Sequence, residues 1–337
     1  MTERTDQRGW TVAVSQHVFP ETVAELRAAG LEVVHRDLDE PATPEELREL
    51  VADADALLCL LTDRVDEALL RAAPRLRLVA TCSAGYDHVD VAAATARGVL
   101  VTHTPGVLHE ATADLTFALL LATARRVVEG DGFTRAGRFR HWKLEQEQLG
   151  LDVHGQTLGI VGLGQIGRAV ARRAAAGFGM RVLYHGRRRL PAEEEARLGV
   201  AYAGLDQLLE ESDVVSLHAP LTPATHHVID AAALARMKPS AVLINTARGP
   251  LVDEAALASA LREGQIAGAG LDVYEDEPEV HPDLLDLTER VVLLPHLGSA
   301  TAGVRRRMAA LSVRSILAAA AGDPPPHCVN PEAAQAG

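Results

Sequence analysis

Two successive series of strand-like and helix-like segments constrain the fold of this chain more than any other feature. In residues 10–104, short β-branched or leucine-rich runs such as TVAVS, LEVVH and ALLCLL alternate with helical patterns such as ETVAELRAAG. A second series begins at Thr157 with TLGIVG and continues through QIGRAVARRAAAGF, MRVLYH, VVSLHA, AVLINTA, IAGAGLDV and VVLLP. Such alternation is typical of parallel sheets joined by helical crossovers. The sequence therefore predicts an α/β protein with two doubly wound parallel sheets.

Two long helical segments indicate how the two sheets are connected. A helical pattern over residues 107–128 separates the two series and runs into a polar stretch that ends near Leu149, so we expect one helix crossing between domains. An alanine-rich helix over residues 301–321 ends before the run DPPP at 323–326. Because the first sheet is complete by then, we expect this helix to return to the first domain. The predicted domains are a substrate domain of residues 1–104 and 299–337, and an inserted cofactor domain of residues 105–298.

Charge and cysteine content exclude several classes of function. The formal net charge of −13 opposes binding to nucleic acid or to an anionic membrane surface, and an anionic substrate needs a local cluster of positive groups. No apolar stretch approaches the ~20 residues of a membrane-spanning helix, and the polar start of the chain does not resemble a secretory signal. The three cysteines are widely separated and have no metal-ligand spacing. We expect a cytoplasmic protein without a metal site.

A glycine-rich turn predicts a dinucleotide site. Gly162-Leu163-Gly164-Gln165-Ile166-Gly167 fits G-x-G-x-x-G, follows the strand LGIV and opens a helix. The glycines permit a tight turn and a close approach of backbone N–H groups to a pyrophosphate, and the helix N-terminus supplies partial positive charge. A plain strand-to-helix turn is the alternative, but the strand before the motif and the helix after it favour dinucleotide binding.

The residues after the next strand favour NADP(H) over NAD(H), although NAD(H) stays possible. An NAD-specific protein places an Asp or Glu there for the ribose 2′-hydroxyl, whereas this chain has Gly186, Arg187, Arg188 and Arg189. Guanidinium groups bind phosphate in a bidentate manner, and a carboxylate would repel it. A solvated basic loop is the alternative interpretation.

Three charged residues follow strands of the second series and suit the chemistry of a 2-oxo acid. Arg248 follows AVLINTA, Glu277 lies just after IAGAGLDV, and His296 follows VVLLP. Ligands of doubly wound sheets lie at the carboxyl ends of the strands. Reduction of a 2-oxo acid needs a cation to hold the carboxylate and an acid to protonate the developing alkoxide, which Arg and His can supply. A neighbouring carboxylate orients an imidazole and favours its protonated form. We therefore predict Arg248, Glu277 and His296 to be catalytic.

Six motifs in one order give the chain a resemblance to a known family over nearly its whole length. It resembles the D-isomer-specific 2-hydroxyacid dehydrogenases, and among them most of all the glyoxylate/hydroxypyruvate reductases. The motifs are TCSAGYDHVD at 81–90, ATADLT at 111–116, the GLGQIG turn, NTARG at 245–249, GLDV at 270–273 with Glu277-Pro278, and PHLGSAT at 295–301. The resemblance implies a Rossmann NAD(P)-binding domain inserted into a discontinuous flavodoxin-like substrate domain.

The resemblance also implies roles for individual residues. Arg248 binds the substrate, His296 donates the proton, Glu277 pairs with His296, and the amides of Ser83, Ala84 and Gly85 hold the substrate carboxylate. The implied enzyme is a homodimer, and Trp142 stands where some relatives place a tryptophan that reaches the partner's active site; an ordinary packed aromatic is the alternative. The residues implied or predicted to line the cofactor are Thr112, Gly162, Leu163, Gly164, Gln165, Ile166, Gly167, Gly186, Arg187, Arg188, Pro220, Thr246, Ala247, Asp272, His296 and Gly298.

These observations leave three hypotheses of function. The first is an NADPH-dependent reductase of small 2-oxo acids such as glyoxylate and hydroxypyruvate. The second is a related enzyme, either a D-3-phosphoglycerate dehydrogenase or a reductase of bulkier 2-oxo acids; a phosphorylated substrate would need basic residues in segment 82–87, which has none. The third is a nicotinamide-sensing binding protein similar to the co-repressors that share this fold, and the net acidity counts against it.

Overall fold

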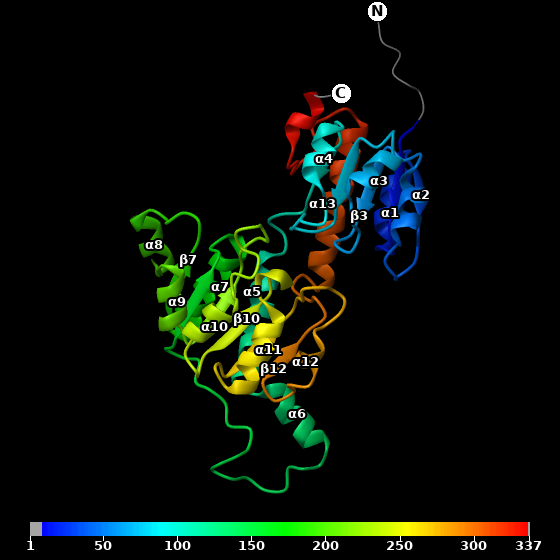
Figure 1. Ribbon diagram of the computed structural model, residues 1–337. Coiled ribbons are helices and arrows are strands. Elements are labelled where there is room, and N and C mark those ends of the chain that lie inside the picture. Colours follow the sequence, from blue (N-terminus) through cyan, green and yellow to red (C-terminus); the bar gives the residue numbers. More distant parts are fainter. Residues whose placement is uncertain (1–8, 336–337) are drawn as a thin grey trace, which may run out of the picture. The chain divides into compact units, whose positions relative to one another are not determined.

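The computed structural model describes residues 9–335, which form two compact units (Figure 1). Unit 1 contains residues 9–108 and 301–335, and unit 2 contains residues 109–300. The chain thus passes from one unit to the other twice, and the boundaries expected from the sequence fall a few residues before both crossing points. Within residues 9–335, no helix is long and apolar enough to cross a membrane.

Unit 1 is built on a parallel sheet of five strands in the order β2-β1-β3-β4-β5, which is the flavodoxin-like order. Every residue of β1, β3 and β4 is buried, because helices cover both faces of a parallel sheet and its central strands are therefore apolar throughout. The strands are β1 (Thr11–Val14), β2 (Glu32–His35), β3 (Ala56–Cys59), β4 (Leu78–Thr81) and β5 (Leu100–Thr102).

Four helices of unit 1 begin at residues whose side chains cap them. Thr43 and Glu46 form a capping box at α2, Asp66 and Asp90 accept hydrogen bonds from the first turns of α3 and α4, and Thr301 does the same at α13. The helices are α1 (Pro20–Ala28), α2 (Pro44–Val51), α3 (Glu67–Ala72), α4 (Val91–Ala96), α13 (Ala302–Ala320) and the short 3₁₀ helix η2 (Pro331–Gln335).

Helix α13 returns to the first unit, as the sequence predicts, and completes one of its two cores. Val313 and Ile316 on α13 are fully buried in a cluster with Val12, Val14 and Leu58 of the sheet. The first and last parts of the chain therefore share one hydrophobic core.

Unit 2 contains a parallel sheet of seven strands in the order β12-β11-β10-β9-β6-β7-β8. The order reverses between β6 and β9, as in a Rossmann fold. The prediction of two parallel doubly wound sheets is thus confirmed. The strands are β6 (Thr157–Val161), β7 (Arg181–His185), β8 (Val200–Tyr202), β9 (Val214–Leu217), β10 (Val242–Asn245), β11 (Gly268–Leu271) and β12 (Val291–Leu293).

The predicted single helix over residues 107–128 is wrong, because the structure has two helices there. α5 ends at Ala124, and Arg126 has a left-handed backbone with φ of 52° before α6 begins. The Ala124 carbonyl accepts a hydrogen bond from the Leu151 amide at 2.8 Å, so a tertiary contact replaces a helical one at the break. The Arg126 side chain donates locally to Glu129 at 2.6 Å.

The helices of unit 2 surround its sheet (Figure 1). α5 carries the fully buried side chains Leu119 and Leu120 and contacts α7, β10 and β11. The helices are α5 (His109–Ala124), α6 (Val127–Arg135), α7 (Gln165–Phe178), α8 (Ala192–Leu198), α9 (Leu205–Glu211), α10 (Ala231–Arg236), α11 (Glu254–Glu263), α12 (Pro282–Leu285) and the 3₁₀ helix η1 (Gly249–Leu251).

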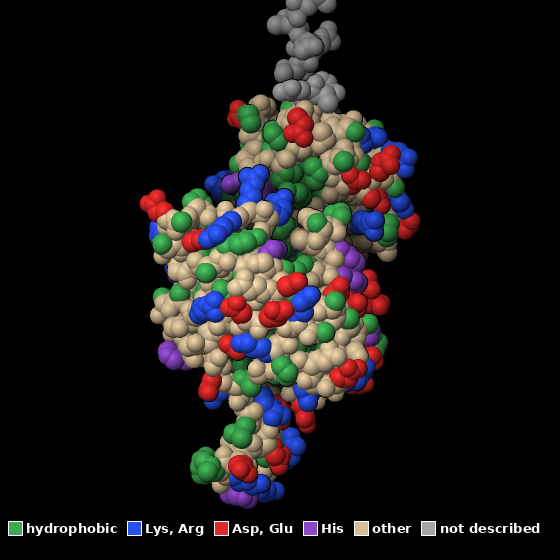
Figure 2. All heavy atoms as spheres, turned by 60° about the vertical axis from the view of Figure 1, so that its left-hand side comes forward, with side chains coloured by type: hydrophobic (Ala, Val, Ile, Leu, Met, Phe, Trp, Pro, Cys, Tyr) green, Lys and Arg blue, Asp and Glu red, His purple; other side chains and the backbone are tan. Residues whose placement is uncertain are grey.

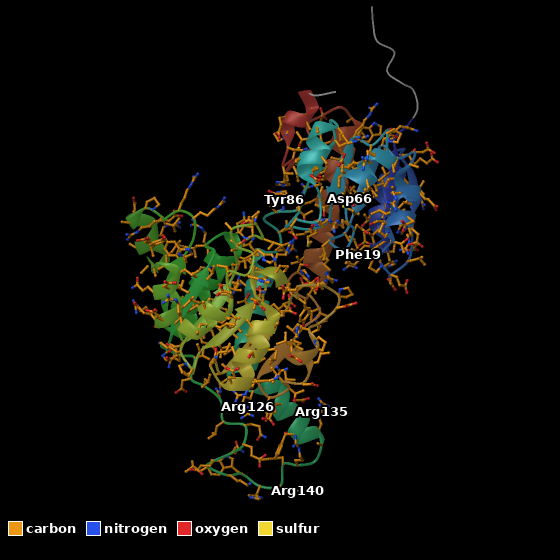
Figure 3. All side chains as sticks on the ribbon, in the orientation of Figure 1. Phe19, Asp66, Tyr86, Arg126, Arg135 and Arg140 are labelled. Atoms are coloured by element: carbon orange, nitrogen blue, oxygen red, sulfur yellow. The ribbon has the colours of Figure 1, made fainter. Side chains whose placement is uncertain are left out.

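Residues 127–149, which we call the arm, project from the body of unit 2. The arm consists of α6 and an irregular segment after it, and Figure 3 labels Arg126 at its base and Arg135 and Arg140 farther along. In Figure 2 the arm stands out from unit 2 with hydrophobic and charged side chains at its tip. Its exposed apolar residues are Val127, Val128, Phe139, Trp142, Leu144 and Leu149.

Candidate functional site

The glycine-rich turn joins β6 to α7 and leaves its backbone accessible. Gly162 has a φ of +96°, and a Cβ there would lie 2.5 Å from the Ala219 amide nitrogen. A Cβ on Gly167 would lie 2.3 Å from the Gly162 carbonyl oxygen. Gly164, the N-cap of α7, differs, since a Cβ there would have no described heavy atom within 4 Å. The first and third glycines are thus required by the fold, whereas the second faces open space at a helix N-terminus. This geometry fits a dinucleotide pyrophosphate.

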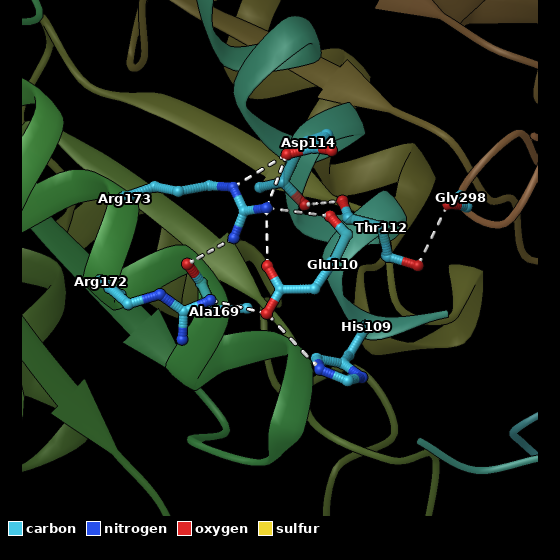
Figure 4. A network of polar contacts seen from close by, with 9 residues as sticks. His109, Glu110, Thr112, Asp114, Ala169, Arg172, Arg173 and Gly298 are labelled. Carbon is cyan, nitrogen blue, oxygen red and sulfur yellow. Dashed lines mark hydrogen bonds and ion pairs between the residues drawn. The ribbon is translucent and has the colours of Figure 1, made fainter. Parts of the chain in front are cut away.

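Helix α7, which begins at this turn, is held against α5 by ion pairs (Figure 4). Arg172 donates to Glu110 at 2.6 Å, and Arg173 pairs with Asp114 at 2.7 Å and with Glu110 at 2.8 Å. These hydrogen bonds lower the pKa of the Glu110 carboxyl group. The helix N-terminus that would bind an anion therefore has a fixed position in unit 2.

The basic loop after β7 contains arginines in two different environments. Arg189 donates two hydrogen bonds, each 3.0 Å long, to Glu195 of α8, and Tyr184 donates a third to Glu195 at 2.8 Å. By contrast, Arg187 and Arg188 are exposed and form no ion pair with any of the residues 9–335. Two of the three guanidinium groups thus remain available to a ligand.

His296 and Glu277 are in direct contact. His296 Nδ1 lies 2.8 Å from Glu277 Oε2, and their side chains are 27% and 28% exposed. The other carboxylate oxygen, Oε1, accepts the Tyr274 amide at 3.1 Å. Because Nδ1 faces the carboxylate, Nε2 is the ring nitrogen left to exchange a proton with a ligand.

Asp272 fixes the backbone on both sides of His296. Its carboxylate accepts the Leu297 amide at 2.7 Å and the Gly298 amide at 2.8 Å, and its carbonyl accepts the His296 amide at 3.0 Å. His296 itself has a φ of 53°, a left-handed conformation that a non-glycine residue rarely adopts. Burial raises the pKa of the Asp272 carboxyl group. Thr112 donates to the Gly298 carbonyl at 3.1 Å and ties this segment to α5 (Figure 4).

Arg248 stands in a turn after β10 that Asn245 organises. The Asn245 side chain accepts the Ala247 amide at 3.0 Å and donates to the Arg248 carbonyl at 2.8 Å. Thr246 and Thr116 of α5 share a hydrogen bond of 2.9 Å. The structure brings this turn against the segment that carries Glu277, because a Cβ on Gly249 would lie only 1.8 Å from the Tyr274 carbonyl carbon.

The remaining predicted site residues have separate positions. In unit 1, the Ser83 hydroxyl donates to the Gly85 carbonyl at 2.6 Å, and His103 contacts the Ala84 carbonyl at 2.7 Å. The amides of Ser83, Ala84 and Gly85 donate to no acceptor among residues 9–335, so they are available to an anion. In unit 2, Pro220 is exposed after β9, and Trp142 in the arm is 70% exposed.

Sequence reasoning missed the residues that hold these groups in place. Asn245, Tyr274 and Glu254 each fix a loop through hydrogen bonds between their side chains and backbone atoms. A polar residue that ends a buried strand was a usable signal for Asn245. No local pattern identifies Tyr274 or Glu254, because their partners come from other loops.

Comparisons with known proteins agree with this architecture. Residues 117–298 match the family model for the D-isomer specific 2-hydroxyacid dehydrogenase, NAD binding domain. A glyoxylate reductase from Korarchaeum cryptofilum (strain OPF8) is 53% identical over 293 residues, which are 87% of this chain and 87% of that protein. The structure of an NADPH-dependent glyoxylate/hydroxypyruvate reductase from Sinorhizobium meliloti with NADP and malonate has a TM-score of 0.84 and 34% identity, covering 96% of this chain and 98% of that one. A D-lactate dehydrogenase from Aquifex aeolicus, complexed with NAD and lactic acid, has a TM-score of 0.81 and 32% identity, covering 93% and 96%.

Proposed function

Because the chain belongs to the D-isomer specific 2-hydroxyacid dehydrogenase family, we propose that it reduces small 2-oxo acids, glyoxylate and hydroxypyruvate among them, to D-2-hydroxy acids with NADPH. The observation that carries this proposal is the contact between His296, which follows β12, and Glu277, which follows β11, in the same unit as the glycine-rich turn. The relatives named glyoxylate reductase support the choice of substrate.

The proposed chemistry divides between the cofactor and the protein. NADPH, when bound, supplies the hydride that is added to C2 of the 2-oxo acid. Arg248 holds the substrate carboxylate and polarises the carbonyl, because a guanidinium presents two parallel donors to a carboxylate. His296 delivers a proton from Nε2 to the developing alkoxide, and Glu277 holds the ring by Nδ1 and stabilises its positive charge. The free amides of Ser83, Ala84 and Gly85 supply further donors for the carboxylate.

NADPH is the proposed coenzyme because of the two exposed arginines. Arg187 and Arg188 provide the positive charge that a ribose 2′-phosphate requires, and the loop has no carboxylate that would bind a 2′-hydroxyl instead. The similar enzyme from Sinorhizobium meliloti is described as NADPH-dependent. The other residues proposed to line the cofactor are Thr112, Gly162 to Gly167, Gly186, Pro220, Thr246, Ala247, Asp272 and Gly298.

We also propose that the enzyme is a homodimer and that the arm takes part in the interface. The arm exposes large apolar side chains, with Trp142 at 70% and Leu144 at 80% exposure, and exposed apolar surface of this kind marks contacts with another protein. Trp142 is proposed to approach the active site of the partner. A cytoplasmic location is proposed because all three cysteines are free thiols.

An activity assay with one variant tests the function. Loss of NADPH absorbance on addition of glyoxylate or hydroxypyruvate distinguishes an enzyme from a binding protein, and a panel of larger and phosphorylated 2-oxo acids defines the substrate. His296→Ala should lower turnover by ~10²–10⁴-fold, because general acid catalysis contributes that much, while NADPH binding is unchanged. His154→Ala, an exposed histidine before β6, is the control and should keep full turnover. Full turnover by His296→Ala would remove this residue from the mechanism.

A further inference from the structure

Two loops that carry proposed catalytic residues are joined by a reciprocal pair of hydrogen bonds. Glu254, the first residue of α11, follows the turn of Arg248, and Glu275 lies two residues before Glu277. The Glu254 amide donates to Glu275 Oε2 at 3.0 Å, and the Glu275 amide donates to Glu254 Oε1 at 3.0 Å. Each glutamate thus binds the backbone of the other with its side chain.

The link between the two loops is buried at Glu254, whereas the Glu275 side chain is 27% exposed. Glu254 is only 3% exposed, and burial raises the pKa of its carboxyl group. His227 Nε2 lies 2.6 Å from the second oxygen of Glu275, and the His227 amide donates to the Pro250 carbonyl at 2.8 Å. The pair therefore connects three loops on one side of unit 2.

Backbone contact leaves these loops little freedom to move separately. Gly249, directly after Arg248, touches the backbone of Tyr274, and a Cβ there would lie 2.4 Å from the Glu275 amide nitrogen. The Tyr274 amide in turn holds Glu277 at 3.1 Å, and the Tyr274 hydroxyl donates to the Leu294 carbonyl, two residues before His296, at 2.8 Å. A continuous set of contacts thus runs from the Arg248 turn to the segment of His296.

We propose that Glu254 and Glu275 are positioning residues that fix the guanidinium of Arg248 relative to the Glu277–His296 pair. This inference rests on the proposed function, since it assumes that those three residues act on one substrate. Capping of α11 alone does not account for the link, because Asp253 already accepts the Ala256 amide at 2.9 Å as the N-cap. A link that fixes two loops relative to each other matters most for a reaction that needs side chains from both loops at defined positions.

Single variants of the full-length chain test the link. Glu275→Ala and Glu254→Ala should each lower kcat for glyoxylate about 10- to 100-fold, because small displacements of catalytic groups have effects of that size, while the Kd for NADPH is unchanged. Glu275→Gln should retain most of the activity, since its amide oxygen can accept the Glu254 amide and its NH₂ group can donate to His227. Glu263→Ala, at the opposite end of α11, is the matched control and should behave as the wild type. If Glu275→Ala does not fold, Glu275→Asp shortens the same side chain and keeps its charge.

Combined variants separate positioning from a general loss of stability. The double variant Glu254→Ala with Glu275→Ala should be no slower than the slower single variant, because both substitutions break one link. When His296→Ala is already present, adding Glu275→Ala should lower kcat by less than about threefold. The reason is that the proton donor that Glu275 helps to position is then already missing. An equal loss in both backgrounds, or a folded Glu275→Ala enzyme with wild-type kcat, would overturn the proposal. No loss of NADPH absorbance when glyoxylate or hydroxypyruvate is added to the wild-type protein would instead refute the proposed function.

Discussion

Replacement of Gly164 by alanine tests whether the glycine-rich turn binds a pyrophosphate. The backbone at Gly164, with φ of −77° and ψ of −160°, is accessible to any L-residue, and the added methyl group would meet no described atom within 4 Å. Gly and Ala differ at an N-cap by up to about 1 kcal/mol, so the free energy of unfolding should change by no more than that. The folded protein should therefore tolerate the substitution.

Binding of the cofactor, by contrast, should be weakened by Gly164→Ala. If the pyrophosphate approaches the backbone of Gly164, the methyl group occupies that space, and overpacking of this kind costs about 1–3 kcal/mol. Such a cost corresponds to an increase in Kd of about 5- to 150-fold for NADPH and NADH alike. Fluorescence titration with each cofactor measures the Kd values, and thermal unfolding without cofactor measures stability.

Two other glycines of the same strand-turn-helix unit provide controls. Gly177→Ala lies on the exposed part of α7, where a Cβ also has no described atom within 4 Å, and it should stabilise the fold by up to about 1 kcal/mol without an effect on cofactor binding. Gly162→Ala should destabilise the free protein by at least about 1–3 kcal/mol, since its φ is +96° and its Cβ would contact Ala219. A folded Gly164→Ala protein with wild-type affinity for both cofactors would refute the assignment of the turn.

The remaining predictions concern cofactor choice, pH and assembly. Arg187→Ala combined with Arg188→Ala should lower kcat/KM for NADPH about 10- to 100-fold and leave NADH unchanged, with Arg181→Ala at the other end of β7 as control; equal losses for both cofactors would show that the loop does not recognise the 2′-phosphate. Hydrogen bonds from Arg189 and Tyr184 lower the pKa of Glu195 below its usual 4.5. Wild-type stability should therefore exceed that of Glu195→Gln above about pH 4.5, and the difference should disappear as the pH falls through the lowered pKa. Urea unfolding at several pH values measures this, and a constant difference would contradict it. Leu144→Asp in the arm should convert the proposed dimer to a monomer in analytical ultracentrifugation, and a wild-type dimer that survives the change would exclude Leu144 from the interface.

Local sequence patterns predicted those helices and strands that are specified mainly by their own residues and immediate neighbours in the chain. The bounds of α7 correspond to the predicted segment QIGRAVARRAAAGF, because its apolar face, the glycine turn before it and the glycine after it are all encoded locally. The central strands of both sheets were identified as continuous apolar runs for the same reason. By contrast, α10, α12 and β8 are short and were not predicted, since tertiary packing rather than pattern sustains elements of this length.

The candidate site, too, was predictable from the sequence only in part. Residue type and position after a strand were enough to select Arg248, Glu277 and His296, because doubly wound sheets collect ligand-binding residues at one edge. The sequence could not predict that Asp272 binds two amides beside His296, or that Glu254 and Glu275 bind each other's backbone. Both arrangements depend on loops that meet only in the folded chain. The break between α5 and α6 was missed for the same reason, because the contact of Ala124 with Leu151 decides it.

Because the first strands and α13 share one hydrophobic core, the order of synthesis affects the order in which the two units can fold. A ribosome releases Val12, Val14 and Leu58 between 255 and 304 residues before Val313 and Ile316, the side chains that help to cover them. Residues 109–300 are continuous, so the second unit can fold while the first still lacks a helix, which reverses the usual order in which the leading domain of a nascent chain folds first. Until α13 has been synthesised, part of one face of the earliest sheet stays exposed to other chains and to chaperones.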